Sequence, residues 1–366
     1  MAGLYIHIPF CAKKCAYCNF YSACVTETVF ESYFQALIKE IRKWGGSLGR
    51  PFETVYIGGG TPSLLGERII PLMWAIRESF NILPNAEITA EMNPDGDYQL
   101  FLTAAQKAGV NRISIGAQSG IDSELALLGR THSSYDTKKA FFAAREAGFK
   151  NISLDLMTGL PDSSINSLKT SLDFLGDLNP EHISTYILKI EEKTKLSMCK
   201  GLNLPDEDAQ AEQYLFTCKY LEEKGYSHYE ISNFSKQGFE GRHNLKYWQC
   251  EEYLGIGPAA HSFIDGKRFF YPANLKGFIN NPHTEADGEG GGCEEYFMLN
   301  LRLKKGINLI EFSCKFGITI HSDLYDYLHL LQKEGLIKLK QDTLSLTDEG
   351  MLVSNTVITE ILERLI

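Results

Sequence analysis

Residues 4–18, LYIHIPFCAKKCAYC, join a short apolar strand pattern to three cysteines, Cys11, Cys15 and Cys18, at intervals of four and three. A short loop with this spacing suits one face of an iron–sulfur cube. Four irons need four ligands and the loop offers three, so one iron is left open to a group that is not protein. The spacing therefore predicts a 4Fe-4S cluster with one open iron.

Other uses of these thiols stay open at this point. A single zinc ion needs a fourth ligand, and zinc–cysteine sites usually come as two separated pairs. A disulfide framework suits small secreted chains and not a chain of 366 residues. Cys24 offers a fourth thiol, although the aromatic residues between it and Cys18 are more typical of a barrel wall. A chance grouping of buried thiols is the remaining alternative.

Composition narrows the class of protein. A content of 44% hydrophobic and 22% charged residues is ordinary for globular proteins, and 366 residues favour one large domain with a smaller one. Nine cysteines indicate a reducing compartment, no apolar run is long enough to cross a bilayer, and the first residues lack a basic signal region. We expect a cytoplasmic protein that is not transmembrane. Its net charge of −10 argues against general nucleic-acid binding.

Strand and helix patterns alternate as far as residue 223. Such repeated units predict a parallel sheet covered by helices. Six units are too few for a closed eightfold barrel, so we expect an α/β fold with a partial (β/α)6 barrel and a ligand at the carboxyl ends of its strands. The predicted strands are 4–8, 54–57, 87–91, 112–117, 152–157 and 182–188, and the predicted helices are 30–44, 64–80, 98–108, 136–147, 164–175 and 206–223.

The sequence changes character after residue 280. Residues 281–293 are polar and glycine-rich, which predicts a linker or long surface loop between a first domain, 1–280, and a last one, 294–366. The last domain has eight Lys and Arg against eleven Asp and Glu, which argues against DNA binding and favours packing or covering a substrate. Three helical patterns, a hairpin-like pair and a closing segment predict an α+β winged-helix-like module; they are 295–303, 310–316, 324–334, 336–340 with 343–346, and 348–366.

A glycine-rich turn, Gly58-Gly59-Gly60-Thr61-Pro62, follows the second predicted strand. Glycines let the backbone approach a ligand closely and leave N–H groups free to donate, while a plain βα turn is the competing interpretation. The Lys-Ser/Thr ending of a phosphate loop is absent from this turn. Either role would fit its position at a strand end.

Polar residues also mark the later strands. Glu91 is suited to accept hydrogen bonds from an ammonium or a ribose, or it is a solvated strand end. Asp155 interrupts an apolar strand, so it should be paired or face a ligand. Gln118 ends another strand, and Arg130 lies on a loop where a surface role would be ordinary.

These features together closely resemble the radical S-adenosylmethionine (SAM) superfamily, and within it the group that contains oxygen-independent coproporphyrinogen III oxidase and the HemW-type haem chaperones. The motifs that carry the resemblance are CxxxCxxC, GGGTP, the later Glu and Gln, and Gly159-Leu160-Pro161, and the similarity covers nearly the whole chain. It implies that Cys11, Cys15 and Cys18 hold a 4Fe-4S cluster and that SAM chelates the open iron. Residues that match SAM-lining positions are Tyr5, Tyr17, Gly59, Gly60, Thr61, Glu91, Gln118, Arg130 and Asp155, with Lys189 and His261 as looser matches.

Two features separate the oxidase from the chaperones. The oxidase carries a further cysteine two residues after the third ligand and a longer N-terminal extension, whereas here Phe20 takes that position and ten residues precede Cys11. The segment 242–248, RHNLKYW, resembles the chaperones' HNxxYW signature, which implies that His243 binds haem; imidazole is a common axial ligand. A hydrogen-bonded loop histidine beside two core aromatics is the alternative, and Cys250 is a rival ligand.

The resemblance favours a protein that binds haem and hands it to an apo-haemoprotein, with the cluster and SAM shaping that activity. An electron donor is needed if SAM is cleaved, and no catalytic residue is assigned. The first alternative is radical oxidative decarboxylation of coproporphyrinogen III to protoporphyrinogen IX. A weaker alternative is another radical SAM reaction on a tetrapyrrole, such as methyl transfer.

Overall fold

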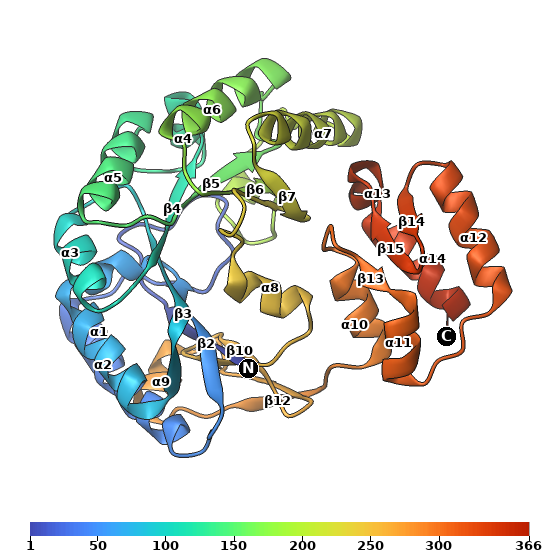
Figure 1. Ribbon diagram of the computed structural model, residues 1–366. Helices are drawn as coiled ribbons and strands as arrows, with labels where there is room; N and C mark the ends of the chain where they lie inside the picture. Colours follow the sequence, from blue (N-terminus) through green and yellow to red (C-terminus); the bar gives the residue numbers. More distant parts are fainter. Residues whose placement is uncertain (366) are drawn as a thin grey trace.

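Six parallel strands form the centre of the computed structural model, which describes residues 1–365 (Figure 1). Each strand pairs in parallel with the next one along the chain, which confirms the predicted partial barrel. The third strand differs most from its predicted bounds, because it begins at Asn81 instead of residue 87. The strands are β1 Ala2–Ile8, β2 Pro51–Gly59, β3 Asn81–Met92, β4 Arg112–Gln118, β5 Ile152–Thr158 and β6 His182–Ile187.

Helices cover the outer face of this curved sheet (Figure 1). The first helix buries Phe30, Phe34, Leu37 and Ile41, a helical spacing that places one apolar stripe against the strands. All six predicted helices are present, and a short one, α4, was not predicted. The helices are α1 Glu27–Gly45, η1 Pro62–Arg68, α2 Ile69–Ser79, α3 Gln99–Lys107, α4 Asp122–Leu127, α5 Ser134–Glu146, α6 Ile165–Leu178 and α7 Glu207–Glu223.

The sheet is wider than the six predicted strands, because later segments extend both of its edges to a total of twelve. One of them, β9, pairs in parallel with β1, and the strands beyond it are antiparallel. The predicted linker 281–293 is therefore only partly a loop: Glu285–Glu289 forms the exposed edge strand β12. The added elements are η2 Leu196–Met198, β7 Ser227–Glu230, β8 Asn233–Ser235, α8 Arg242–Trp248, β9 Tyr253–Ile256, β10 His261–Ile264, β11 Lys267–Phe270 and α9 Leu275–Asn280.

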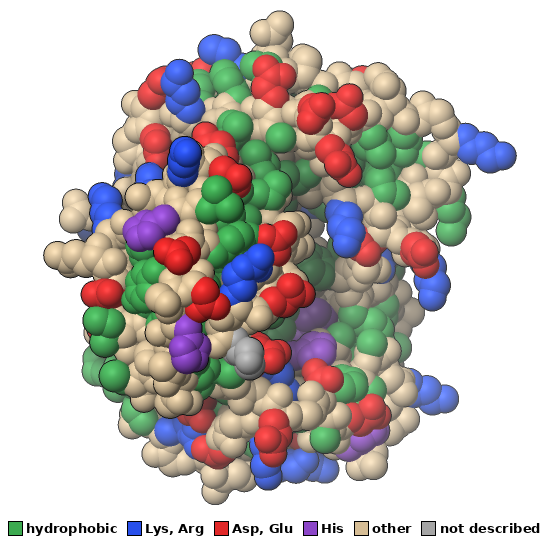
Figure 2. Space-filling view, turned by 90° about the vertical axis from the view of Figure 1, so that its right-hand side faces the viewer, with side chains coloured by type: hydrophobic (Ala, Val, Ile, Leu, Met, Phe, Trp, Pro, Cys, Tyr) green, Lys and Arg blue, Asp and Glu red, His purple; other side chains and the backbone are tan. Residues whose placement is uncertain are grey.

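The C-terminal part has its own three-stranded antiparallel sheet, in the order β13-β15-β14, beside helices. This agrees with the predicted α+β module, except that the closing segment is two helices; Ile366 lies outside the described residues. Figure 2 shows the face that carries this part, where acidic and basic side chains are interspersed. Its elements are α10 Cys293–Asn300, β13 Ile307–Asn308, α11 Leu309–Phe316, α12 Ser322–Lys333, β14 Ile337–Lys340, β15 Thr343–Leu346, α13 Asp348–Leu352 and α14 Ser354–Leu365.

Helix α8 lies inside the arc of strands, at their N-terminal ends (Figure 1). The backbone N–H groups of Arg242 and His243 donate to the carboxylate of Glu87, and Lys246 donates to Glu53 and to the carbonyl of Met1. Met1 precedes β1, Glu53 lies near the start of β2, and Glu87 of β3 pairs with Thr54 beside it, so α8 closes the end of the barrel opposite the loops that follow the strands. Among residues 1–365, no helix has the length and apolar character needed to cross a bilayer.

Candidate functional site

The cysteine loop, residues 9–24, leaves the C-terminal end of β1 and folds back on itself. The N–H of Ala23 donates to the carbonyl of Pro9 (2.8 Å), and the N–H of Cys11 donates to the carbonyl of Ala23 (3.2 Å). His7, at the end of β1, places Nε2 2.9 Å from the carbonyl of Tyr21, within hydrogen-bond distance. The loop is thus fixed at both ends, and Cys11, Cys15 and Cys18 within it are half-buried.

Two neighbouring loops hold the middle of the cysteine loop. The N–H of Ala16 donates to the carbonyl of Leu128 (2.9 Å), and the N–H of Leu196 donates to the carbonyl of Ala16 (2.8 Å). Ala16 and Tyr17 also pack against a small apolar cluster above the strands, formed by Leu128, Met157, Leu160, Leu188 and Leu196. Apolar packing excludes water from this side of the loop.

Two of the three sulfurs receive hydrogen bonds from other loops, one that follows β2 and one that follows α4. Thr61 Oγ1 donates to Sγ of Cys11 at 3.5 Å, and Arg130 Nη1 donates to Sγ of Cys15 at 3.4 Å. Burial raises the pKa of the Cys18 thiol, and the nearby Cys15 and Cys11 add to that rise. Sulfur atoms in such surroundings become thiolate ligands when a metal group balances their charge.

The spacing of the sulfurs bears on the kind of metal group that fits. Two sulfurs on one zinc ion lie no more than roughly 4.6 Å apart, twice a Zn–S bond. Among residues 1–365, the cysteines of this loop do not form a set of ligand atoms that all lie within 4.8 Å of one another. Among the described residues this loop therefore holds no preformed single-metal site, and its ligation of a cluster stays a prediction. Cys24 is exposed, and its thiol donates to the carbonyl of Ala12.

The GGGTP turn uses its amides inside the protein. The N–H of Gly60 donates to Ile8 (2.8 Å) and that of Thr61 donates to Phe10 (2.7 Å), while Gly59 donates to Glu91 (3.1 Å). The expectation of free N–H donors in this turn is therefore wrong for all three residues. Glycine is needed at position 60 because a Cβ there would lie 2.4 Å from the carbonyl oxygen of Phe10.

Two carboxylates face the interior of the barrel. Glu91 accepts hydrogen bonds from the hydroxyl of Tyr56 (2.7 Å) and the N–H of Gly59, and desolvation together with nearby Asp155 raises its pKa to about 7. Desolvation also raises the pKa of Asp155, whose Oδ1 accepts from Ser114 at 3.3 Å. Neither carboxylate is a solvated strand end, so both fit the binding of a cationic group.

Arg130 belongs to this site and not to the surface. Its Nη2 donates to Oδ1 of Asn93 (2.8 Å) and to the carbonyl of Gly116 (2.7 Å), and its Nε donates to Nδ1 of His132 (3.4 Å). Gln118 lies nearby at a β-bulge with a positive φ of 68°. The structure thus brings Cys15, Arg130 and Gln118 together with two residues that no motif had marked, Asn93 and His132.

The sequence contained weak signals for the residues that were missed. Asn93 comes directly before Pro94 and two residues after Glu91, and His132 comes two residues after Arg130. His7, which holds the cysteine loop, alternates with Tyr5 on one face of β1, and the hydroxyl of Tyr5 lies 2.9 Å from Nδ1 of His7. Alternation along a strand was the signal that could have identified His7.

The two looser matches make other contacts, and their role toward SAM stays a prediction. The ammonium of Lys189 pairs with Glu191 at 3.4 Å and its side chain is 84% exposed. His261 stacks on Phe270 of β11 and lies 3.7 Å from the carboxylate of Asp287 in β12. His261 therefore contacts the outer strands of the sheet, on the extension beyond β9.

His243 lies at the other end of the barrel from the cysteine loop. Its Nδ1 is 2.8 Å from the hydroxyl of Thr54 and its Nε2 is 2.8 Å from the hydroxyl of Tyr247. The ring is 1% exposed and stacks on Tyr5 and Tyr56, and desolvation lowers its pKa to about 3. Both ring nitrogens are engaged, so in this conformation His243 is the hydrogen-bonded core histidine that was the alternative reading. Its role as a haem ligand stays a prediction.

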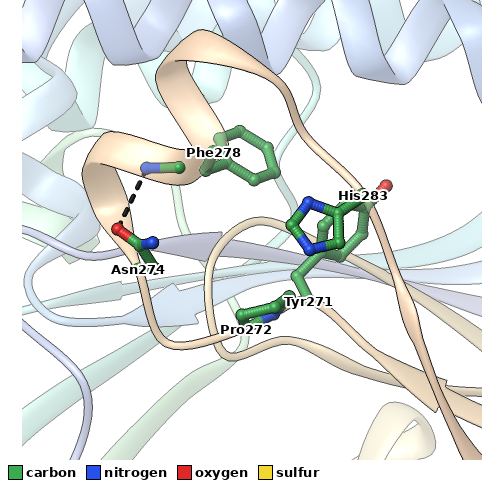
Figure 3. A pocket seen from close by; sticks show the side chains of 6 residues that line it. Tyr271, Pro272, Asn274, Phe278 and His283 are labelled. Atoms are coloured by element: carbon green, nitrogen blue, oxygen red, sulfur yellow. Dashed lines mark hydrogen bonds between the residues drawn. The ribbon is translucent and has the colours of Figure 1, made fainter.

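A small cavity lies between the end of β11 and α9 (Figure 3). Tyr271, Phe278 and His283 line it, and the hydroxyl of Tyr271 donates to the buried Glu40 while accepting from Trp44. Its volume is about 10 Å³, and it contains none of the residues expected to bind a cofactor. Ligand pockets usually have ~300–1,000 Å³, so this cavity is too small for a nucleoside-sized molecule.

Comparison with known proteins gives family matches to both parts of the chain. The radical SAM superfamily matches residues 5–175, and the HemN C-terminal domain matches residues 293–353. The chain is 36% identical to the haem chaperone HemW of Bacillus subtilis, over 100% of both chains. It is 35% identical to the haem chaperone HemW of Escherichia coli, over 97% of each.

Among solved structures, the coproporphyrinogen III oxidase HemN of Escherichia coli, a radical SAM enzyme, has a similar fold. The TM-score is 0.84, with 98% of this chain and 89% of that chain covered. The sequence identity is 23%, so the likeness concerns the fold.

Proposed function

The chain belongs to the HemW family of haem chaperones within the radical SAM superfamily, and from that membership we propose that it binds haem and delivers it to apo-haemoproteins. The observation that carries the proposal is the end-to-end similarity to these chaperones at 32–36% identity. Because nine free cysteines call for a reducing environment, the proposal places the protein in the cytoplasm.

We further propose that Cys11, Cys15 and Cys18 hold a 4Fe-4S cluster whose fourth iron binds SAM. Bound together, the cluster and SAM would supply one-electron chemistry, for which an electron donor is needed. The chain's own part is to hold both groups in place. The hydrogen bonds to two sulfurs support the cluster, and the paired carboxylates support a cationic ligand beside it. The residues proposed to line SAM are Tyr5, Tyr17, Gly59, Gly60, Thr61, Glu91, Gln118, Arg130 and Asp155.

The oxidase is the alternative function, and two observations count against it. Phe20 stands where the oxidase has a further cysteine, and its side chain is 71% exposed. The likeness to the solved oxidase is below 25% identity, which carries the fold alone. The tetrapyrrole substrate of the oxidase is therefore not transferred to this chain.

One experiment separates the two functions. Protein reconstituted anaerobically with iron and sulfide is given SAM and a reductant, and then either haem or coproporphyrinogen III. We expect stoichiometric haem uptake, followed by transfer of the haem to an apo-haemoprotein such as apomyoglobin, and no protoporphyrinogen IX. Reproducible turnover of coproporphyrinogen III would overturn the chaperone proposal in favour of the oxidase.

A further inference from the structure

A continuous chain of hydrogen bonds connects two of the cysteine sulfurs. Thr61 Oγ1 donates to Sγ of Cys11 and accepts from Nδ2 of Asn93 at 3.1 Å. Oδ1 of the same Asn93 accepts from Nη2 of Arg130 at 2.8 Å, and Nη1 of Arg130 donates to Sγ of Cys15. Asn93 links the two halves of this chain, because its side-chain amide bonds to both sulfur donors, Thr61 and Arg130.

The far end of the chain is anchored as well. Nδ1 of the buried His132 accepts from Nε of Arg130, and its Nε2 lies 3.2 Å from the carbonyl of Ala117. A carbonyl can only accept, so the imidazole carries its proton on Nε2 and offers a lone pair on Nδ1. Gly116 leaves room for this arrangement, because a Cβ there would come within 3.1 Å of Asn93 Oδ1 and 3.2 Å of Arg130 Nη2.

We propose that Asn93, supported by His132, is a positioning residue that aims Thr61 and Arg130 at the sulfurs of Cys11 and Cys15 and thereby sets the reduction potential of the cluster. The inference rests on the proposed ligation of a cluster by these cysteines. Asn93 itself contacts neither sulfur in the structure; it acts through the two residues that do.

The physical basis is the charge of the reduced cluster. Reduction adds negative charge that spreads onto the cysteine sulfurs, and donors directed at sulfur stabilise the reduced state more than the oxidised state. A guanidinium adds a full positive charge to this effect. Removing the amide of Asn93 frees Thr61 and Arg130 to take other rotamers, so the sulfurs lose directed donors. The potential should then shift to a more negative value.

The test measures the midpoint potential of the reconstituted cluster by an EPR-monitored redox titration without SAM. The variants are Asn93→Ala, Thr61→Val and the double variant. Asn111→Ala is the matched control, because Asn111 also makes two hydrogen bonds: it accepts from the N–H of Ile88 and donates to the carbonyl of Ala86, both in the middle of β3. Iron content and thermal stability are measured for each protein.

We expect Asn93→Ala and Thr61→Val each to shift the potential to more negative values, with the double variant shifting less than the sum of the two. Asn111→Ala should lower the thermal stability and leave the potential unchanged. An unchanged potential in an iron-loaded Asn93→Ala protein, or strictly additive shifts, would overturn the inference. If the Asn93→Ala protein binds too little iron to be titrated, an unchanged potential in the Thr61→Val protein would overturn the inference. A wild-type protein that holds no cluster would refute the proposed function instead.

Discussion

Nε2 of His243 and the hydroxyl of Tyr247 lie 2.8 Å apart on successive turns of α8, so the tyrosine occupies the nitrogen that a haem iron would need. The other nitrogen, Nδ1, is held by Thr54 at 2.8 Å. A haem bound to His243 must first displace one of these hydroxyls.

This contact makes Tyr247→Phe a sharper test of the haem ligand than removal of the histidine. The variant keeps the ring and frees Nε2, so we expect tighter haem binding in a spectrophotometric titration. His243→Ala removes two buried hydrogen bonds and should cost about 1–3 kcal/mol of unfolding free energy, which by itself could impair binding. Haem affinity that does not change in Tyr247→Phe would argue against ligation through Nε2.

The cluster cysteines make a second prediction. Cys11→Ala, Cys15→Ala and Cys18→Ala should each abolish the brown chromophore after reconstitution, because three protein ligands leave none to spare. Cys24→Ala is the control, since that thiol is exposed and donates to a carbonyl, and it should keep the full iron content. Iron and sulfide analysis measures the cluster content of the three ligand variants and of the control. A full iron complement in any of the first three variants would refute the ligand assignment.

The pKa of Glu91 predicts how SAM binding depends on pH. Desolvation and the neighbouring Asp155 raise this pKa to about 7, so the carboxylate is charged above pH 7 and protonated below it. A cationic amino group binds the charged form, and SAM affinity should therefore weaken as the pH falls from 8 to 6, by up to about tenfold per unit below the pKa. Calorimetry at several pH values measures the effect. The Glu91→Gln protein should bind SAM more weakly, and its SAM affinity should depend less on pH. An unchanged pH dependence would count against Glu91 as the group that binds the cationic part of SAM.

The close contact at Gly60 makes a prediction about stability. Its added Cβ would lie 2.4 Å from the carbonyl oxygen and 2.8 Å from the nitrogen of Phe10, so Gly60→Ala must push the cysteine loop away from β2. We expect a loss of about 1–3 kcal/mol and poorer iron loading. Gly49→Ala serves as the control, since its Cβ would meet no atom within 4 Å. Equal melting temperatures for the two variants would contradict the steric argument.

The two parts of the chain are joined by a polar contact at Asp348. Its carboxylate accepts from Lys304 and lies 3.0 Å from Nδ1 of His228 in β7. Burial raises the pKa of Asp348, but these two partners outweigh it and lower the pKa overall. Cys218, His228 and Asp348 place their ligand atoms close enough together to hold a metal ion. The ammonium of Lys304, however, already balances the charge of the Asp348 carboxylate.

We therefore expect Asp348→Asn to lower the unfolding free energy by about 1–3 kcal/mol at pH 7. A depressed acid pKa stabilises the fold above its unfolded-state value, and this contribution is lost as the pH falls through the folded-state value. The difference between wild type and variant should accordingly persist down to the unfolded-state value of 3.8 and shrink below it, which denaturant titrations at about pH 7 and about pH 2 can measure. Asp326→Asn is the control, because Asp326 is exposed on α12. If the difference in unfolding free energy grew as the pH falls, the assignment of Asp348 as a stabilising carboxylate would be wrong.

Much of the barrel could be predicted from the sequence because its signals are local. The alternation of apolar strands and amphipathic helices is a property of short windows, and parallel pairing brings the carboxyl ends of the strands to one edge. The cysteine loop, Glu91, Gln118 and Asp155 were found in this way. Position on a loop would by itself assign Arg130 to the surface, and only the family resemblance placed it at the SAM site, since nothing local indicates that its guanidinium reaches Asn93 and Gly116.

By itself the sequence determined the strand–helix order, the three-cysteine loop at the end of β1 and the mixed charge of the C-terminal part, because residue order and composition carry these directly. Only the tertiary structure decided that β9 pairs beside β1, that α8 buries His243 at the end of the barrel away from the cysteines, and that Asn93 joins the donors to two sulfurs. Each of these depends on contacts between residues far apart in the chain. Periodicity does not encode such contacts, and packing selects among them only when the whole sheet has formed.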